Sequence, residues 1–244
     1  MELEAALKDL VIANRILSCE GVVDGYGHVS IRHPTNPDHY FMSRSLAPEL
    51  VTRDDLIEFR LDGTPVRPDE RPLYLERFIH GAIYEARPDA NAAIHSHAED
   101  MLPFGITKVP YRTVIHSASD VGSTVPVWDI AEKFGDHTNL LVTTMDQGRD
   151  LAARLAGNAM VLMCCHGFAA ASSTLPGLVR MSVYAPRNAR VLLAAMRMGS
   201  GEARTLSPGE IEARRESLDM YAPAMQRGWR YWATRAGCAD MLDR

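Results

Sequence analysis

The sequence lacks the features that mark membrane, nucleic-acid-binding and secreted proteins. No stretch approaches the roughly 20 uncharged, apolar residues that a bilayer-spanning helix needs, so we expect no membrane partner. The 26 basic residues are outnumbered by 31 acidic ones, and the net charge of −5 argues against a nucleic-acid partner. The first residues, Met-Glu-Leu-Glu, lack the positive charge and apolar run that begin a signal peptide. The prediction is a cytoplasmic protein.

Cysteine is also scarce. The four thiols show no CxxC spacing, and adjacent cysteines rarely bridge each other; they are Cys19, Cys164, Cys165 and Cys238. Because we find no export signal, we expect all four to be reduced and buried.

The remaining composition is that of an ordinary globular protein, with 46% hydrophobic residues and no repeat of 20–50 residues. Hydrophobic periodicity predicts helices over residues 3–17, 73–86, 150–156, 175–198 and 208–235. Short apolar or alternating runs predict strands over residues 28–32, 40–42, 56–60, 91–97 and 160–164. We therefore predict one α/β domain over residues 1–198 and a C-terminal helical tail over residues 199–244.

Two histidines in the strand-like run 91–97 form the first candidate site. His95 and His97 are two residues apart, so in a strand both side chains project from the same face and can bind one metal ion. His-x-His alone is a weak signal, because two histidines at a strand end are often only hydrogen-bonded. The pattern becomes more specific if further ligands lie elsewhere in the chain.

Two such residues are present. His166 directly follows the apolar run 160–164 and a second cysteine, and three histidines with an open position are typical of a catalytic metal site. Glu76, on the helix predicted over residues 73–86, is a candidate for a fourth ligand or for an acid or base.

Three segments of the chain resemble the class II aldolase/adducin family. They are Glu76-Arg77-Phe78-Ile79-His80 with residues 87–97, the later Cys165-His166-Gly167-Phe168-Ala169, and the early Gly27-His28-Val29-Ser30. The resemblance covers residues 5–198. It implies a three-layer α/β/α sandwich around a mostly antiparallel sheet, and a homotetramer with active sites between subunits. It also implies that His95, His97 and His166 bind a divalent metal, usually zinc or manganese, with Glu76 as ligand or acid/base; three imidazoles and a carboxylate suit iron or cobalt as well.

The sequence departs from the sugar-phosphate aldolases of this family where they bind phosphate. Their Gly-Asn-x-Ser loop has His28 in place of Asn, their Thr-Pro-Ser-Gly loop reads Ser43-Arg44-Ser45-Leu46, and bulky residues replace the Ser-Ser pair before Glu76. Fewer small groups remain to wrap a phosphate, so we expect an unphosphorylated small-molecule substrate. Arg44 suits a carboxylate, with Ser43, Ser45 and His28 as further substrate-binding candidates. The alternative for Arg44 is a surface ion pair with Glu49 or Asp54.

A branch of the family that decarboxylates hydroxylated aromatic dicarboxylates fits better. Residues 43–45, 114–116, 126–130 and 229–232 resemble its dihydroxyphthalate and hydroxymethylpyridine-dicarboxylate decarboxylases. In this hypothesis, the metal withdraws charge from a ring hydroxyl while a proton donor protonates the ring carbon, from which CO2 then leaves. Glu76 is the first candidate for that donor and His116, taken from the branch resemblance, is the second.

Two other functions remain open at this point. An aldolase that acts on an unphosphorylated hydroxy-keto acid would use the same metal and Glu76. An adducin-like scaffold module would have no catalytic role, and it would have no need for three metal-binding histidines.

Overall fold

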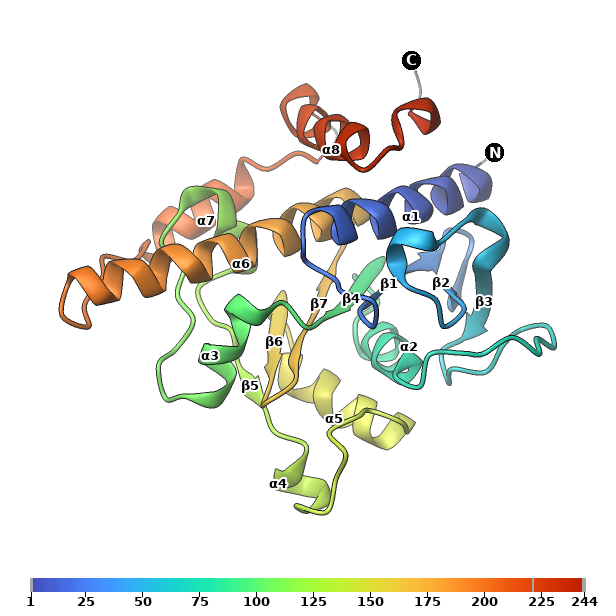
Figure 1. The fold of residues 1–244 in the computed structure, drawn as a ribbon, viewed down its shortest axis with the longest axis horizontal. Helices are drawn as coiled ribbons and strands as arrows, with labels where there is room; N and C mark the ends of the chain where they lie inside the picture. Colours follow the sequence, from blue (N-terminus) through green and yellow to red (C-terminus); the bar gives the residue numbers. More distant parts are fainter. Residues whose placement is uncertain (1, 221, 243–244) are drawn as a thin grey trace.

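The computed structural model describes residues 2–220 and 222–242, and its centre is a seven-stranded sheet (Figure 1). The strands are β1 His28–His33, β2 Asn36–Ser43, β3 Leu56–Arg60, β4 Ala92–Ser96, β5 Val127–Trp128, β6 Met160–Met163 and β7 Gly167–Ser172. Their order in the sheet is β3-β2-β1-β4-β7-β6-β5. Every neighbouring pair is antiparallel except β5 and β6, which are parallel. The sheet is therefore mostly antiparallel, as predicted.

Helices cover both faces of the sheet (Figure 1). On one face lie α1 (Glu2–Cys19) and α6 (Leu175–Met198), with α8 (Pro223–Arg235) packed on their outer side. On the other face lie α2 (Arg77–Ala86) and α5 (Met145–Leu155). Each face has its own hydrophobic cluster, so the predicted three-layer α/β/α sandwich is confirmed. Shorter elements complete the chain: α3 Leu102–Ile106, α4 Ala131–Phe134, α7 Pro208–Glu216, and the 3-10 turns η1 Pro48–Leu50, η2 Arg53–Asp55, η3 Glu99–Met101, η4 His116–Val121 and η5 Ala239–Met241.

Strand alternation decides which side chains face which layer. In β4, Ile94 packs in the cluster with α1 and α6, whereas Ala93 packs in the cluster with α2 and α5. His95 follows Ala93 by two residues, and the neighbouring strands pair it with His28 of β1 and Ala169 of β7. The end of β4 thus places His95 on the sheet face that α2 and α5 cover, next to His28 of β1.

Local sequence explains where the flanking helices begin. The hydroxyl of Thr174 accepts a hydrogen bond from the Gly177 amide at the start of α6, which supplies a partner for a backbone donor that the helix leaves free. Thr144 and Gln147 form a capping box at the start of α5.

Several predicted elements differ from the structure. The helix predicted from residue 73 begins only at Arg77, which leaves Glu76 at its N-cap. The single helix predicted over residues 208–235 is two helices, α7 and α8, because Pro223 has no amide hydrogen to continue a helix and starts α8 instead. Strands β5 and β7 and helices α3 and α4 were not predicted.

The cysteine prediction is correct in part. All four thiols are free of disulfides, but only Cys238 is buried, and Cys19 and Cys165 are exposed. Cys19 ends α1, and Cys165 lies in the turn between β6 and β7, so neither belongs to a packed face.

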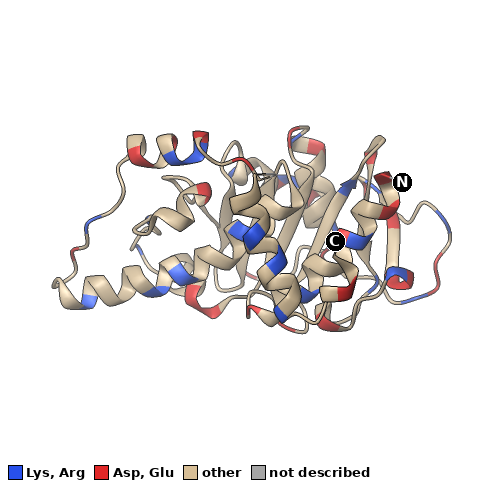
Figure 2. Cartoon of the chain, turned by 90° about the horizontal axis from the view of Figure 1, so that it is seen from above, with Lys and Arg blue, Asp and Glu red and all other residues tan. Residues whose placement is uncertain are grey.

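Tail residues contribute to the core. Trp229 and Trp232 of α8 pack in the cluster that contains α1 and α6, while the domain division at residue 198 stays a prediction. Figure 2 shows basic and acidic residues scattered over the whole ribbon. Within the described ranges, each helix is too short or too polar to cross a membrane.

Candidate metal centre

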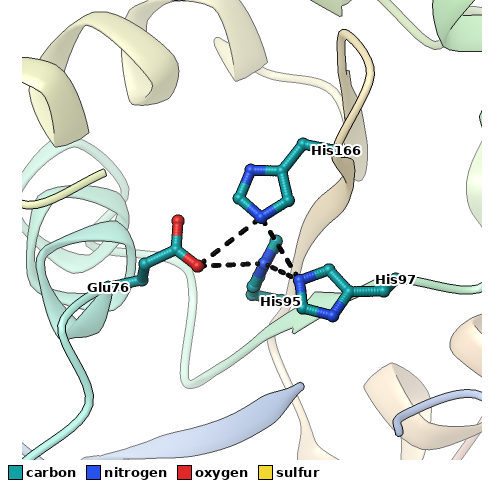
Figure 3. A group of neighbouring side chains, drawn as sticks. All are labelled: Glu76, His95, His97 and His166. Atoms are coloured by element: carbon teal, nitrogen blue, oxygen red, sulfur yellow. Dashed lines mark hydrogen bonds and ion pairs between the residues drawn. The ribbon is translucent and has the colours of Figure 1, made fainter. Parts of the chain in front are cut away.

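Four side chains from separate parts of the chain meet at the end of β4 (Figure 3). They are Glu76 before α2, His95 in β4, His97 just beyond it and His166 in the turn between β6 and β7. The Nε2 atom of His97 lies 2.9 Å from Nε2 of His95 and 3.2 Å from Nε2 of His166. Oε2 of Glu76 lies 3.4 Å from Nε2 of His95 and 3.6 Å from Nε2 of His166. We call these four residues the His-Glu cluster.

A tight turn brings His166 to the cluster. Cys165 has a positive φ of 57°, and the His166 amide donates to the Met163 carbonyl, which reverses the chain between β6 and β7. The next residue must be glycine, because a Cβ atom on Gly167 would lie 2.1 Å from the Ser96 carbonyl oxygen. This close approach lets His166 lie beside His97.

Hydrogen bonds to the outer nitrogens fix two of the imidazoles. Nδ1 of His95 lies 3.1 Å from the Phe168 carbonyl oxygen, which can only accept, so this nitrogen carries the hydrogen. Nδ1 of His97 lies 3.2 Å from the Asp24 carboxylate, which accepts its hydrogen in the same way. A ring that carries its one hydrogen on Nδ1 has a bare lone pair on Nε2, and in both residues Nε2 faces the cluster. Carbonyl and carboxylate partners of this kind commonly orient histidines that bind metals.

The spacing of the four ligand atoms fits a metal ion. Zinc binds imidazole nitrogen at about 2.0–2.1 Å, so two ligands of a tetrahedral ion lie about 3.3 Å apart. The separations of 2.9–3.6 Å within the cluster bracket that value. Bare lone pairs this close repel one another unless a positive charge lies between them, so the donor set fits a divalent cation.

Burial and mutual interaction shift the pKa values of the cluster. Burial alone raises the pKa of Glu76, but hydrogen bonding and charge from His95 and His166, with the Val142 amide, lower it to about 2. The Val142 amide donates to Oε1 of Glu76 over 2.9 Å, which leaves Oε2 for the cluster. Burial, together with the other histidines, lowers the pKa of His97 and lowers that of His166 to about 4. At neutral pH Glu76 is therefore ionised and His97 and His166 are neutral imidazoles, the protonation that metal binding needs.

A pocket of about 370 Å³ opens beside the cluster. Glu76, His97 and His166 form part of its wall. Apolar groups form much of the remainder, and two of them, Tyr26 and Leu75, are 78% and 60% exposed. Among the described residues that line it, none is a lysine or arginine.

The predicted substrate-binding residues are distributed unevenly around this pocket. His28 and Ser45 line it. Ser43 is buried and does not line it. Arg44 also lies outside the lining, and its Nε donates to Asp55 over 2.8 Å rather than pairing with Glu49 or Asp54.

His116 lies in a different pocket, of about 480 Å³, which none of the His-Glu cluster lines. Four arginines and four aromatic residues share this second pocket with His116, and no described acidic residue lines it: Arg180, Arg187, Arg214, Arg227, Tyr184, Trp229, Tyr231 and Trp232. We call it the arginine pocket. Within one chain, His116 is thus separated from the site that it was predicted to serve.

Sequence reasoning missed Asp24 as a partner of His97. Asp24 forms a local turn in which its Oδ1 accepts from the amides of Tyr26 and Gly27. The same carboxylate also reaches His97, 73 residues away. An acidic residue in a loop just before the Gly-x-x-Ser segment was the only signal.

Comparisons with known proteins agree with the geometry. The class II aldolase and adducin N-terminal domain matches residues 8–193. The decarboxylase tropJ of Talaromyces stipitatus is 34% identical over 236 residues, which cover 89% of this chain and 88% of that protein. The 3,4-dihydroxyphthalate decarboxylase of Arthrobacter keyseri is 23% identical over 200 residues, 73% of each chain. Among solved structures, an aldolase II superfamily protein from Pseudomonas syringae has a TM-score of 0.78 at 20% identity, covering 98% of this chain and 94% of that one.

Proposed function

The chain belongs to the class II aldolase and adducin family, and from this premise we propose that it is a divalent-metal-dependent lyase that decarboxylates a hydroxylated aromatic carboxylate. The observation that carries the proposal is the His-Glu cluster, whose imidazole Nε2 atoms lie 2.9 and 3.2 Å apart beside a pocket. The names of the relatives favour loss of CO2 over aldol cleavage.

In this proposal His95, His97, His166 and Glu76 hold one divalent ion, with zinc or manganese as the first candidates. When bound, such an ion supplies Lewis-acid stabilisation of negative charge on a substrate oxygen next to the carbon that loses CO2. The Phe168 carbonyl and Asp24 hold the imidazoles in the tautomer that presents Nε2 to it. His28 and Ser45 face the substrate from the pocket wall.

The proton donor is better assigned to His116 than to Glu76. A carboxyl whose pKa lies near 2 is ionised at neutral pH, which suits a ligand and not an acid. His116 lines the arginine pocket, so it reaches the His-Glu cluster only if that cluster belongs to another copy of the chain.

The two pockets have complementary contents, which supports an active site between copies of a homo-oligomer. The pocket beside the cluster has metal ligands and no described cationic side chain, while no described acid lines the arginine pocket. Asp120 and Glu20 pair with Arg180 and Arg187, which leaves Arg214 and Arg227 as the first candidates for a substrate carboxylate. A carboxylated aromatic ring needs both kinds of group. The tetramer and the cytoplasmic location predicted from the sequence belong to the same proposal, and in it Arg44 is a less suitable anchor because Asp55 already binds it.

The test is release of CO2 from hydroxylated aromatic dicarboxylates by protein whose metal content is measured. We expect turnover with bound metal, and we expect His97→Ala to remove both. His116→Ala should keep the metal and lose turnover, whereas Glu76→Gln should weaken metal binding. Cleavage or condensation with pyruvate and an aldehyde, without CO2 release, would instead identify an aldolase. Protein that takes up no divalent ion would contradict both and favour a scaffold.

A further inference from the structure

A chain of buried hydrogen bonds runs from the pocket wall into the layer between the sheet and α2. Nδ1 of His28 lies 2.7 Å from Nε2 of His80, and Nδ1 of His80 lies 2.6 Å from the Ser30 hydroxyl. The Ser30 hydroxyl lies 2.8 Å from the Tyr84 hydroxyl. All four side chains are buried, and they come from two elements only, β1 and α2. We call this series the His28–Tyr84 chain.

The far end of the chain fixes the direction of its hydrogens. Burial raises the pKa of Tyr84, so the phenol keeps its hydrogen, which needs an acceptor. Ser30 is the one side-chain partner found for that hydroxyl within residues 2–220 and 222–242, so Tyr84 donates to Ser30. The Ser30 hydroxyl has a single hydrogen, which it then donates to Nδ1 of His80.

The direction of these hydrogen bonds also fixes which nitrogen carries the hydrogen in His80 and in His28. Burial lowers the pKa of His80 to about 3, so its ring is neutral and carries one hydrogen. Because Nδ1 of His80 accepts, its hydrogen is on Nε2 and is donated to Nδ1 of His28. The hydrogen of His28 is therefore on Nε2.

Nε2 of His28 has no hydrogen-bond partner among the described residues, although His28 lines the pocket beside the His-Glu cluster. We propose that the His28–Tyr84 chain locks His28 as the Nε2–H tautomer, which donates a hydrogen bond to an anionic oxygen of the substrate. His28 is then a substrate-binding residue, and Ser30, His80 and Tyr84 are positioning residues that act through it.

This inference rests on the proposed function for the kind of substrate, a hydroxyaromatic carboxylate, and on the structure alone for the tautomer. The pocket has no described lysine or arginine, so an N–H donor in its wall contributes strongly to the recognition of an anion. The reverse tautomer would present a lone pair to the same oxygen and repel it.

The first experiment measures the tautomers directly. Long-range proton–nitrogen spectra of zinc-loaded protein labelled with 15N-histidine distinguish Nε2–H from Nδ1–H rings, and His28→Gln and His80→Gln variants assign the signals. We expect both rings to carry hydrogen on Nε2. A hydrogen on Nδ1 of His28 overturns the proposal whether or not the protein has decarboxylase activity.

The second experiment breaks the chain and measures binding of 2-hydroxybenzoate as the probe. Ser30→Ala should weaken binding roughly 5- to 10-fold, convert His28 to a mixture of tautomers and leave the metal content unchanged. Ser182→Ala is the matched control, because Ser182 is also fully buried but lies on α6. A merely structural role would lower the melting temperature without moving the tautomer. Probe affinity unchanged by Ser30→Ala, in protein that still binds zinc and 2-hydroxybenzoate, overturns the role of the chain.

Discussion

Replacing Asp24 by Asn should weaken metal binding without removing any ligand. Oδ1 of Asp24 accepts from the amides of Tyr26 and Gly27 over 2.8 and 2.9 Å, and Nδ1 of His97 lies 3.2 Å from Oδ2 and 3.3 Å from Oδ1. In Asp24→Asn the amide oxygen keeps the two backbone bonds, so the NH2 group takes the place of Oδ2. The NH2 group then faces the Nδ1 hydrogen of His97, for which Oδ1, already shared by two amides, is the one acceptor left at 3.3 Å. This favours the tautomer with hydrogen on Nε2, and an Nε2 atom that carries hydrogen cannot bind a metal.

The magnitude follows from the loss of one outer partner of a metal ligand. Such losses typically cost 10- to 100-fold in metal affinity, about 1.4–2.7 kcal/mol. The assay is competition for zinc against a chelator of known affinity. Asp62→Asn is the matched control, because Asp62 also accepts from a backbone amide two residues on, that of Thr64, and does not contact the His-Glu cluster. Equal zinc affinities of the Asp24 and Asp62 variants would refute the assignment of Asp24 as a partner of the metal site.

Two further predictions concern stability. His80 is fully buried and its pKa is lowered to about 3. As the pH falls below about 6.5, this residue takes up a proton in the unfolded chain but not in the folded chain. The free energy of unfolding that depends on the neutral ring is therefore complete above that pH and is lost as the pH falls toward 3. Urea unfolding of metal-free protein should show His80→Gln flattening the slope between pH 6 and 4 by up to about 1.4 kcal/mol per pH unit, and an unchanged slope would contradict the buried neutral ring. Gly167→Ala places a Cβ atom against the Ser96 carbonyl and should cost roughly 1–3 kcal/mol of unfolding free energy and weaken zinc binding by moving His166. Gly157→Ala, where a Cβ atom meets nothing within 4 Å, should do neither, and equal zinc affinities of the two glycine variants would count against the role of the turn.

Hydrophobic periodicity predicted correctly those elements whose buried face is also the apolar face of their own sequence. Helix α6 begins and ends where predicted, since Thr174 caps its start and Gly199 follows its last residue. The strand β7 was missed because its Phe-Ala-Ala-Ala core has neither alternation nor β-branched residues. Its small side chains are buried on both faces, where two helical layers leave little room, so its conformation is set by neighbours far away in the sequence.

The residues of the candidate site also fall into those that a local pattern predicts and those that only the fold brings together. His95 and His97 could be recognised together because the strand period alone puts them on one face. His166 and Glu76 were candidates from their residue types and flanking elements, and the family resemblance placed them at the same metal. Position in the sequence could not show that Asp55 binds Arg44, since residues 49 and 54 were equally plausible acids.

Polar residues with an adequate local explanation are the hardest to assign. Asp24 looks like a turn former and is one, yet its second oxygen is free to orient His97 because the turn uses only the first. Ser30 looks like an ordinary strand residue, yet a hydroxyl both accepts and donates, so a buried one can transmit the direction of a hydrogen bond from Tyr84 to His80. In each case one side chain satisfies two partners from different parts of the chain. It is the second partner, visible only after folding, that links the residue to the metal site or to the substrate pocket.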